Sequence, residues 1–183
     1  REKILEFIRQ VDIVTFEFEN IPYETLDEIN KSKPVLPKPS VNRLIQHRLA
    51  EKDFVNKLNI RTTRYVSIEK KSDIESLEDF LPGILKIQMW LSIDFSKEYI
   101  LEKLVKLKKE ISIIITRFKN QKYEIYEPIE NTHQDQILKH SKIPADIDNK
   151  IFDQSKDWAI SIAEELKYVG TLCVEFFIDK NDN

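Results

Sequence analysis

The chain has 183 residues, of which 41% are hydrophobic and 33% charged, and its formal net charge is −3. This composition is typical of a globular protein with one full domain or parts of two. With 29 basic against 32 acidic residues it lacks the basic excess of a nucleic-acid-binding protein.

Glycine is the unusual residue of this composition. The chain has two glycines, Gly83 and Gly170, whereas average usage predicts about 13. Two glycines this far apart cannot form a glycine-rich phosphate loop of either common pattern.

Cysteine content and hydropathy indicate the compartment. The lone Cys173 cannot form an intramolecular disulfide, and no cysteines and histidines have metal-ligand spacing. The apolar runs are shorter than the roughly 20 residues of a membrane span. The chain starts at Arg1 without an initiator methionine or a signal sequence. We expect a cytoplasmic protein with no membrane partner, whose natural start is not Arg1.

The first part of the chain reads as the end of an α/β domain, residues 1–38. Apolar residues at helical spacing predict a helix over 2–10, and the alternating string VDIVTFEF predicts a strand over 11–18. A second helix is expected over 23–31. The three prolines within 33–40 remove amide donors and disfavour helix, which predicts a linker or sheet edge and a domain boundary.

The middle part, residues 39–101, begins with a long helix over 40–58, for which Ser40 is the expected N-cap. The following expected elements are a strand over 64–68, a helix over 73–81 and a strand over 83–88.

The last part, residues 102–183, changes to antiparallel β signals. Three consecutive strand-like segments end near residue 129, with a hairpin turn predicted at 119–121. A clear apolar stripe predicts a helix over 149–168, with Gly170 beyond its end. The string TLCVEFFID predicts a strong strand over 171–179.

A few polar residues in these segments could carry chemistry. Lys86 and Glu175 lie inside apolar strands, where a solvent-facing position is the simplest reading. For Glu175 the apolar neighbours weaken that reading, because a carboxylate among apolar groups needs a partner. Glu102 and Glu110 lie at strand ends, and His133 is most simply a hydrogen-bonding loop residue. From the residues alone, the chain is an α/β fragment with a buried-looking carboxylate.

Several strings, in order along nearly the whole chain, point further. They are DIVTFEFENIP, QHRLAEKDFVNKLNIRTTRY, ILK, YILEKLVKLKKEISII, YEPIENTHQDQIL and AEELKYVGTLCVEFFID. Together they resemble the 5-(carboxyamino)imidazole ribonucleotide synthases of purine biosynthesis, which belong to the ATP-grasp superfamily. The resemblance implies an α/β end of an N-terminal domain over 1–38, a linker helix and ATP-grasp lid subdomain over 39–101, and an ATP-grasp core subdomain over 102–183.

The resemblance also implies roles for individual residues. Arg48 and Lys86 would contact the ATP phosphates, and Glu110 would accept hydrogen bonds from the ribose. The hinge whose backbone meets adenine would consist of Glu102, Lys103, Leu104 and Val105. His133 would be a further nucleotide-binding residue, and Glu175 the first of two acidic Mg²⁺ ligands. Glu17 or Glu19 would lie on the substrate side.

The implied reaction is ATP-driven carboxylation of aminoimidazole ribonucleotide by bicarbonate, through carboxyphosphate, in a homodimer. The sequence departs from the family pattern, because no glycine-rich lid separates Lys86 from Glu102 and the second metal carboxylate would lie beyond Asn183. Two explanations stay open: the chain is part of a longer enzyme that has these segments, or it is a fragment or degenerate copy that has lost them. As the sequence stands, we expect the 183-residue polypeptide itself to be inactive.

Two other functions remain open. One is a sister ATP-grasp ligase, such as a formate-dependent glycinamide ribonucleotide transformylase. The other is a non-catalytic nucleotide-binding or dimerisation module.

Overall fold

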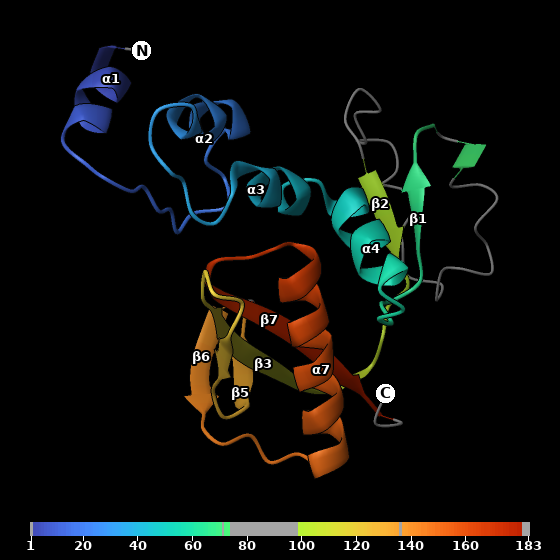
Figure 1. Cartoon of the computed structure of the whole chain (residues 1–183). Helices are drawn as coiled ribbons and strands as arrows, with labels where there is room; N and C mark the ends of the chain where they lie inside the picture. The colour runs from blue at the N-terminus through green and yellow to red at the C-terminus, as the bar shows by residue number, and fades with distance from the viewer. Residues whose placement is uncertain (1, 71, 74–98, 136, 181–183) are drawn as a thin grey trace.

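The computed structural model describes residues 2–70, 72, 73, 99–135 and 137–180. Two small helices near the N-terminus lead through a third helix to a helix that lies beside a two-stranded ribbon, and a larger sheet carries a long helix on one face (Figure 1). No described helix has the length and the apolar character needed to cross a membrane. The order of elements agrees with an α/β segment followed by α+β units, as predicted.

The N-terminal unit consists of α1 (Glu2–Arg9) and α2 (Tyr23–Asn30), both at the predicted places. The strand predicted over 11–18 is wrong except at one point, a parallel bridge between Val14 and Val35. Pro34 explains one end of this, since its nitrogen carries no hydrogen to donate to residue 12, which a longer parallel ladder in this register would need. Apolar residues from the two helices and this bridge form a small core: Ile8, Val14, Leu26, Ile29 and Val35.

The single helix predicted over 40–58 is two helices, α3 (Pro39–Ile45) and α4 (Arg48–Lys57). Ser40 is not the N-cap, because α3 begins one residue earlier with Pro39 in the first turn, where its missing N–H costs nothing. His47 breaks the helix with an extended backbone, and its Nδ1 accepts a hydrogen bond from the Ala50 amide. This break gives α4 its own N-terminus directly before Arg48.

Beyond α4 lies a two-stranded antiparallel ribbon of β1 (Tyr65–Ile68) and β2 (Tyr99–Glu102). The register pairs Tyr65 with Glu102, and the amide of Lys103 continues the contact by donating to the Arg64 carbonyl at 2.8 Å. The helix expected over 73–81, apart from its first residue, and the strand expected over 83–88, which contains Lys86, lie outside the described residues.

The larger sheet is antiparallel and has the order β4-β3-β5-β6, with β7 on the other side of β3. Its strands are β3 (Leu107–Arg117), β4 (Tyr123–Ile125), β5 (Ile129–Gln134), β6 (Ile137–Lys142) and β7 (Gly170–Asp179). The predicted hairpin joins β3 and β4, and Gln121 adopts the left-handed conformation there, with φ of 70°, that glycine more often supplies. The sequence suggested a loop position for His133, but the residue lies in β5.

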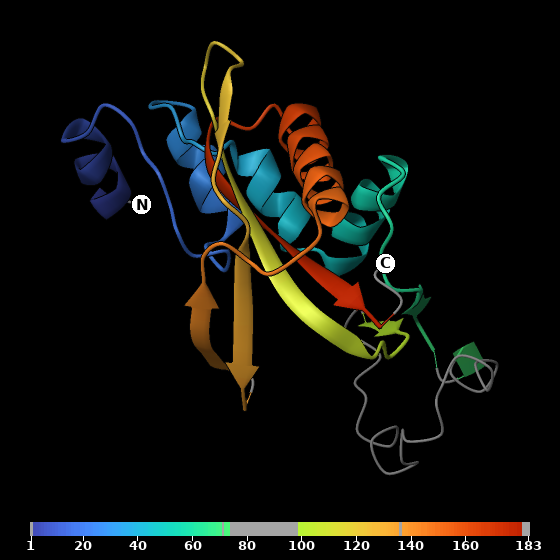
Figure 2. The same cartoon turned by 90° about the horizontal axis from the view of Figure 1, so that it is seen from below.

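Helix α7 (Asn149–Glu165) covers one face of this sheet, alongside β3 and β7 (Figure 2). The main core lies between them, where Ile113 and Ile115 of β3 are fully buried against Ala159 and Ala163. The helix ends earlier than predicted, because Lys167, which directly follows the C-cap residue Leu166, already takes the left-handed conformation, with φ of 47°. The opposite face of the sheet carries no described helix.

Candidate functional site

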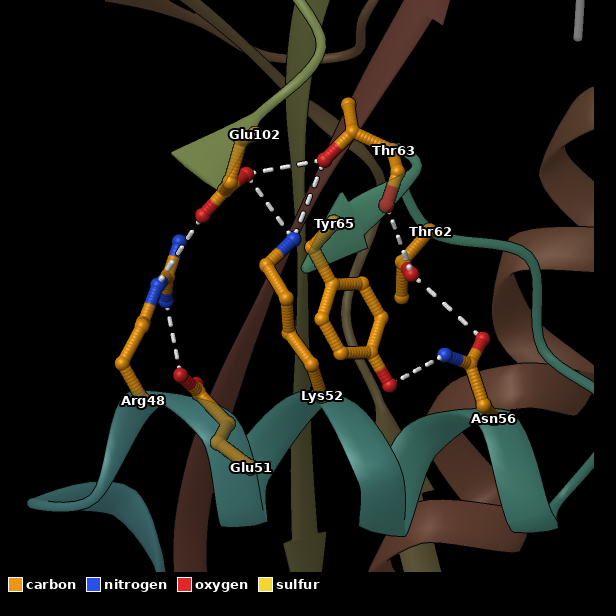
Figure 3. A network of polar contacts seen from close by, with 8 residues as sticks. All are labelled: Arg48, Glu51, Lys52, Asn56, Thr62, Thr63, Tyr65 and Glu102. Carbon is orange, nitrogen blue, oxygen red and sulfur yellow. Dashed lines mark hydrogen bonds and ion pairs between the residues drawn. The ribbon is translucent and has the colours of Figure 1, made fainter. Parts of the chain in front are cut away.

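A network of charged and polar side chains joins α4 to the β1–β2 ribbon (Figure 3). Glu102, at the end of β2, stands at its centre. Its Oε2 accepts hydrogen bonds from Lys52 Nζ at 2.9 Å and Thr63 Oγ1 at 2.8 Å, and its Oε1 faces Arg48 Nε at 3.5 Å. Arg48 also pairs with Glu51 at 2.7 Å. Two cations one helical turn apart on α4 thus share one carboxylate of β2.

Tyr65 borders the same network. Its ring lies 5.4 Å from Lys52 Nζ, and its hydroxyl donates to Asp53 at 2.6 Å and accepts from Asn56 at 2.9 Å. The hydrogen bond to Asp53 raises the pKa of the Tyr65 hydroxyl, and burial adds to the rise. An open hollow of about 310 Å³ adjoins it, lined by Asn56, Thr62, Thr63, Arg64, Tyr65 and Val66.

The partners of Glu102 set its protonation state. Burial by itself would raise the pKa of this carboxyl, but hydrogen bonds from Lys52 and Thr63 and the charges of Lys52 and Arg48 hold the pKa below its ordinary value of 4.5. The carboxylate is therefore ionised over the whole neutral range and can bind both cations.

This lowered pKa predicts a contribution to stability that depends on pH. A carboxyl with a lower pKa in the folded chain stabilises the fold above its unfolded pKa, and the contribution disappears as the pH falls through the folded value. Urea denaturation at about pH 6 and about pH 3 should therefore show a smaller loss of stability for Glu102→Gln than for the unaltered chain. Equal losses in the two proteins would contradict this assignment.

A second polar group lies on the open face of the large sheet. Glu110 of β3 and His133 of β5 meet at 2.6 Å between Oε2 and Nδ1, so the structure brings two sequence-predicted residues together. Next to them, Asn131 donates to Ser112 at 2.6 Å and accepts from Ser141 at 2.9 Å. These side chains form a polar band across β3, β5 and β6.

The open face also bears Glu175, which corrects one expectation. The sequence suggested a buried carboxylate, but Glu175 is exposed in β7, opposite Ser112 in the register. Its neighbours Val174 and Phe176 point toward α7, whereas Cys173 and Phe177 lie on its own, uncovered face. Burial raises the pKa of the Cys173 thiol, although the residue is partly exposed. Among the described residues, no group of three or more acidic, histidine or cysteine side chains gathers to hold a metal ion.

The residues after Glu102, which the resemblance assigns to a hinge, are accessible. Lys103 and Leu104 are exposed, Leu104 to 71%, and Val105 is half-buried. Lys86 falls outside the described residues.

The expected substrate-side residues, Glu17 and Glu19, are exposed and lie apart from the network in sequence. Helix α3 fixes their segment through the main chain. The side-chain amide of Gln46 donates to the carbonyls of Glu19 and Ile21, and Asn42, fully buried, donates to the Ile21 carbonyl at 2.8 Å.

Sequence reasoning missed the residues that hold this site together, above all Lys52, Thr63 and Asn131. One signal was available for Lys52, which follows Arg48 by four residues and so shares its face of α4. Thr63 lies between α4 and β1, and its partners come from α4 and β2. The partners of Asn131 come from β3 and β6, and no local pattern indicates such contacts.

Comparison with known families identifies the fold. Residues 85–183 match the model of the ATP-grasp domain. The chain belongs to the ATP-grasp family. Residues 1–46 match the ribonucleotide synthetase preATP-grasp domain, which agrees with the fold expected from the resemblance.

Proteins similar to this chain are named for purine synthesis or for carboxyaminoimidazole synthesis. An N5-carboxyaminoimidazole ribonucleotide synthase of Brucella melitensis is 29% identical over 97% of this chain and 56% of its own length. The bifunctional purine synthesis protein purC/E of Dictyostelium discoideum is 29% identical over 96% of this chain and 20% of its own length. The crystal structure of the Staphylococcus aureus N5-carboxyaminoimidazole synthetase complexed with ADP has a TM-score of 0.87 at 26% identity, covering 100% of this chain and 53% of that one.

The chain spans about half the length of the synthases that it matches. The resemblance to carboxyaminoimidazole ribonucleotide synthases is thus confirmed, and the family to which the chain belongs is a family of enzymes.

Proposed function

We propose that this ATP-grasp chain is built for ATP-dependent carboxylation of 5-aminoimidazole ribonucleotide with bicarbonate, in purine biosynthesis, and that the 183-residue polypeptide retains the nucleotide-binding part of that function. The observation that carries the proposal is the juxtaposition of Arg48 with Glu102, which begins an exposed hinge, in a chain whose relatives are named for this reaction. Arg48 is half-exposed and directed by two carboxylates, so its guanidinium is held in place for an anionic ligand.

The nucleotide would lie between the α4 network and the open face of the large sheet. In this assignment Arg48, with Lys86, binds the phosphates, and the main chain of Glu102, Lys103, Leu104 and Val105 meets the adenine. Glu110 accepts from the ribose hydroxyls, with His133 beside it, and the short contact between their side chains supports a shared task.

Mg²⁺ fits Glu175 by chemistry, since this ion takes one or two carboxylates together with phosphate oxygens. An exposed carboxylate on a rigid strand, next to the Ser112 position, is open to such an ion. The ion would neutralise charge on the transferring phosphoryl group.

The proposed chemistry has two balanced steps. A bicarbonate oxygen attacks the γ-phosphorus of ATP, the bond to the β-phosphate oxygen breaks, and carboxyphosphate and ADP form. The exocyclic amine of the ribonucleotide then takes the carboxyl carbon and loses a proton, and inorganic phosphate leaves. The cations at positions 48 and 86 neutralise phosphate charge in the first step, while Glu17 or Glu19 would face the ribonucleotide.

The stretch between Lys86 and Glu102 lacks the glycine-rich lid of the family pattern, so we infer that the 183-residue polypeptide binds ATP without turning it over. We also propose that the protein is a cytoplasmic homodimer and that its domain boundaries lie after residues 38 and 101. The lone cysteine agrees with a reducing compartment.

Calorimetric titration with ATP and Mg²⁺ tests the assignment. We expect saturable ATP binding that weakens about tenfold in Arg48→Met, since one charge-assisted phosphate contact is lost. Arg43→Met is the matched control. It removes an arginine of α3 that lies 5.1 Å from the ring of Tyr23 on α2, and it should bind ATP as the unaltered chain does.

An ADP-release assay with aminoimidazole ribonucleotide and bicarbonate should show only background turnover. Turnover would refute the inferred inactivity and support the full reaction. Absence of ATP binding would refute the nucleotide site and leave a structural remnant of the fold, whereas turnover that requires another substrate would favour a sister ligase.

A further inference from the structure

The Glu102 carboxylate is engaged by protein groups on every described side. Lys52 and Thr63 donate to one oxygen and Arg48 approaches the other. The side chain points toward α4 and the start of β1 (Figure 3), while the chain continues from the same residue into the exposed hinge. Glu102 therefore acts as an anchor for the residues that follow it, and its carboxylate has little capacity left for a ligand.

Lys52 is the partner that makes this anchor strong. The residue is only 7% exposed, and its ammonium contacts Glu102, the Thr63 hydroxyl at 3.0 Å and the face of the Tyr65 ring. A buried ammonium loses most of its hydration and is tolerated only when a carboxylate and hydrogen bonds replace the water. Lys52 and Glu102 therefore hold each other in one geometry, which surface ion pairs do not do.

The anchor extends into the main chain of the hinge. Directly after Glu102, the Lys103 amide donates to the Arg64 carbonyl at 2.8 Å. Arg64 follows Thr63, which itself bonds to both Glu102 and Lys52. The Lys103 amide is thus held by the segment of Thr63 and Arg64, and Thr63 also holds the Glu102 side chain. Displacement of Lys52 would loosen both contacts.

We propose that Lys52 is a positioning residue of the nucleotide site, acting through Glu102 to hold the hinge at residues 103–105 in place for the adenine. The part of this inference that concerns adenine rests on the proposed function; the part that concerns the hinge does not. In this assignment Lys52 does not touch the nucleotide, and Arg48 at the phosphate end keeps its own pair with Glu51 when Lys52 is replaced.

Amide hydrogen exchange on the 183-residue chain tests the hinge directly. In Lys52→Met we expect the Lys103 amide, which donates to the Arg64 carbonyl, to exchange about tenfold faster or more, because the anchored segment then opens locally. Lys52→Arg, which keeps the charge, should restore part of the protection. Lys57→Met removes an exposed lysine of the same helix and should change nothing. Unchanged exchange in Lys52→Met would overturn the inference.

Nucleotide binding separates positioning from a general loss of structure. For Lys52→Met we expect the Kd for ATP to rise about tenfold, while the Kd for inorganic tripolyphosphate stays within about twofold, since only adenine reads the hinge. Equal weakening of the binding of both ligands would indicate a structural role only and would overturn the proposal.

If the unaltered chain fails to bind ATP, the proposed function fails, and the exchange experiment still decides whether Lys52 holds the hinge. Should Lys52→Met not fold, Thr63→Val, which removes one donor to Glu102, takes its place with the same expected outcomes.

Discussion

Replacement of Ile113 by alanine is expected to lower the free energy of unfolding by about 3 kcal/mol, within the range of about 2–5 kcal/mol for large-to-small changes in a core. Ile113 is 0% exposed and lies between β3 and α7, against Ala159 and Ala163. These small residues let the helix lie close to the sheet but cannot fill the cavity that the substitution leaves. Urea denaturation followed by circular dichroism measures the change.

Ile114→Ala is the matched control for this prediction. The side chain at position 114 is adjacent in the same strand but lies on the open face and is only partly buried. We expect a loss of about 1 kcal/mol or less, as for substitutions outside a packed core. Equal losses at 113 and 114 would show that α7 does not cover the face assigned to it.

Replacement of Glu102 by leucine should lower the free energy of unfolding by about 2 kcal/mol, because it leaves the Lys52 ammonium buried without a carboxylate. The effect is smaller than the 3–5 kcal/mol typical of fully buried pairs, since the Glu102 side chain is 32% exposed and water reaches it. In the double variant Lys52→Met/Glu102→Leu both charges are gone, and most of the lost stability should return.

A double-mutant cycle by chemical denaturation measures this coupling. Asp153→Ala, which breaks the pair between Asp153 and Lys156 on the exposed face of α7, is the comparison and should change stability by less than about 0.5 kcal/mol. Additive losses in the Lys52–Glu102 cycle would mean that the two side chains do not depend on each other, which would also undermine the anchoring of the hinge.

Elements with strong local periodicity could be predicted from the sequence. The stripe of α7 and the strand β7 carry their burial pattern in consecutive residues, and the β3–β4 hairpin follows from two strand-like segments with a polar turn. The strand expected over 11–18 has an equally good local pattern, but a strand needs a neighbour that can supply donors and acceptors, and Pro34 has no N–H to offer in this register.

The candidate site could be predicted only in part, and for a related reason. Motif resemblance named Arg48, Glu102, Glu110 and His133, and the structure brings these residues together in two pairs. The exposure of Glu175 could not be predicted, because an alternating strand does not reveal which of its faces a helix will cover. The role of Thr63 depends on a partner 39 positions away.

The way α3 holds the segment of Glu17 and Glu19 has a consequence for how this region can change. Gln46 and Asn42 bind only carbonyl oxygens there, and every residue type offers the same carbonyl. The path of the segment is therefore encoded in the helix, while the identities of the side chains at 17 and 19 are left free to suit a ligand. Recognition could diverge at these two positions without disturbing the scaffold that presents them.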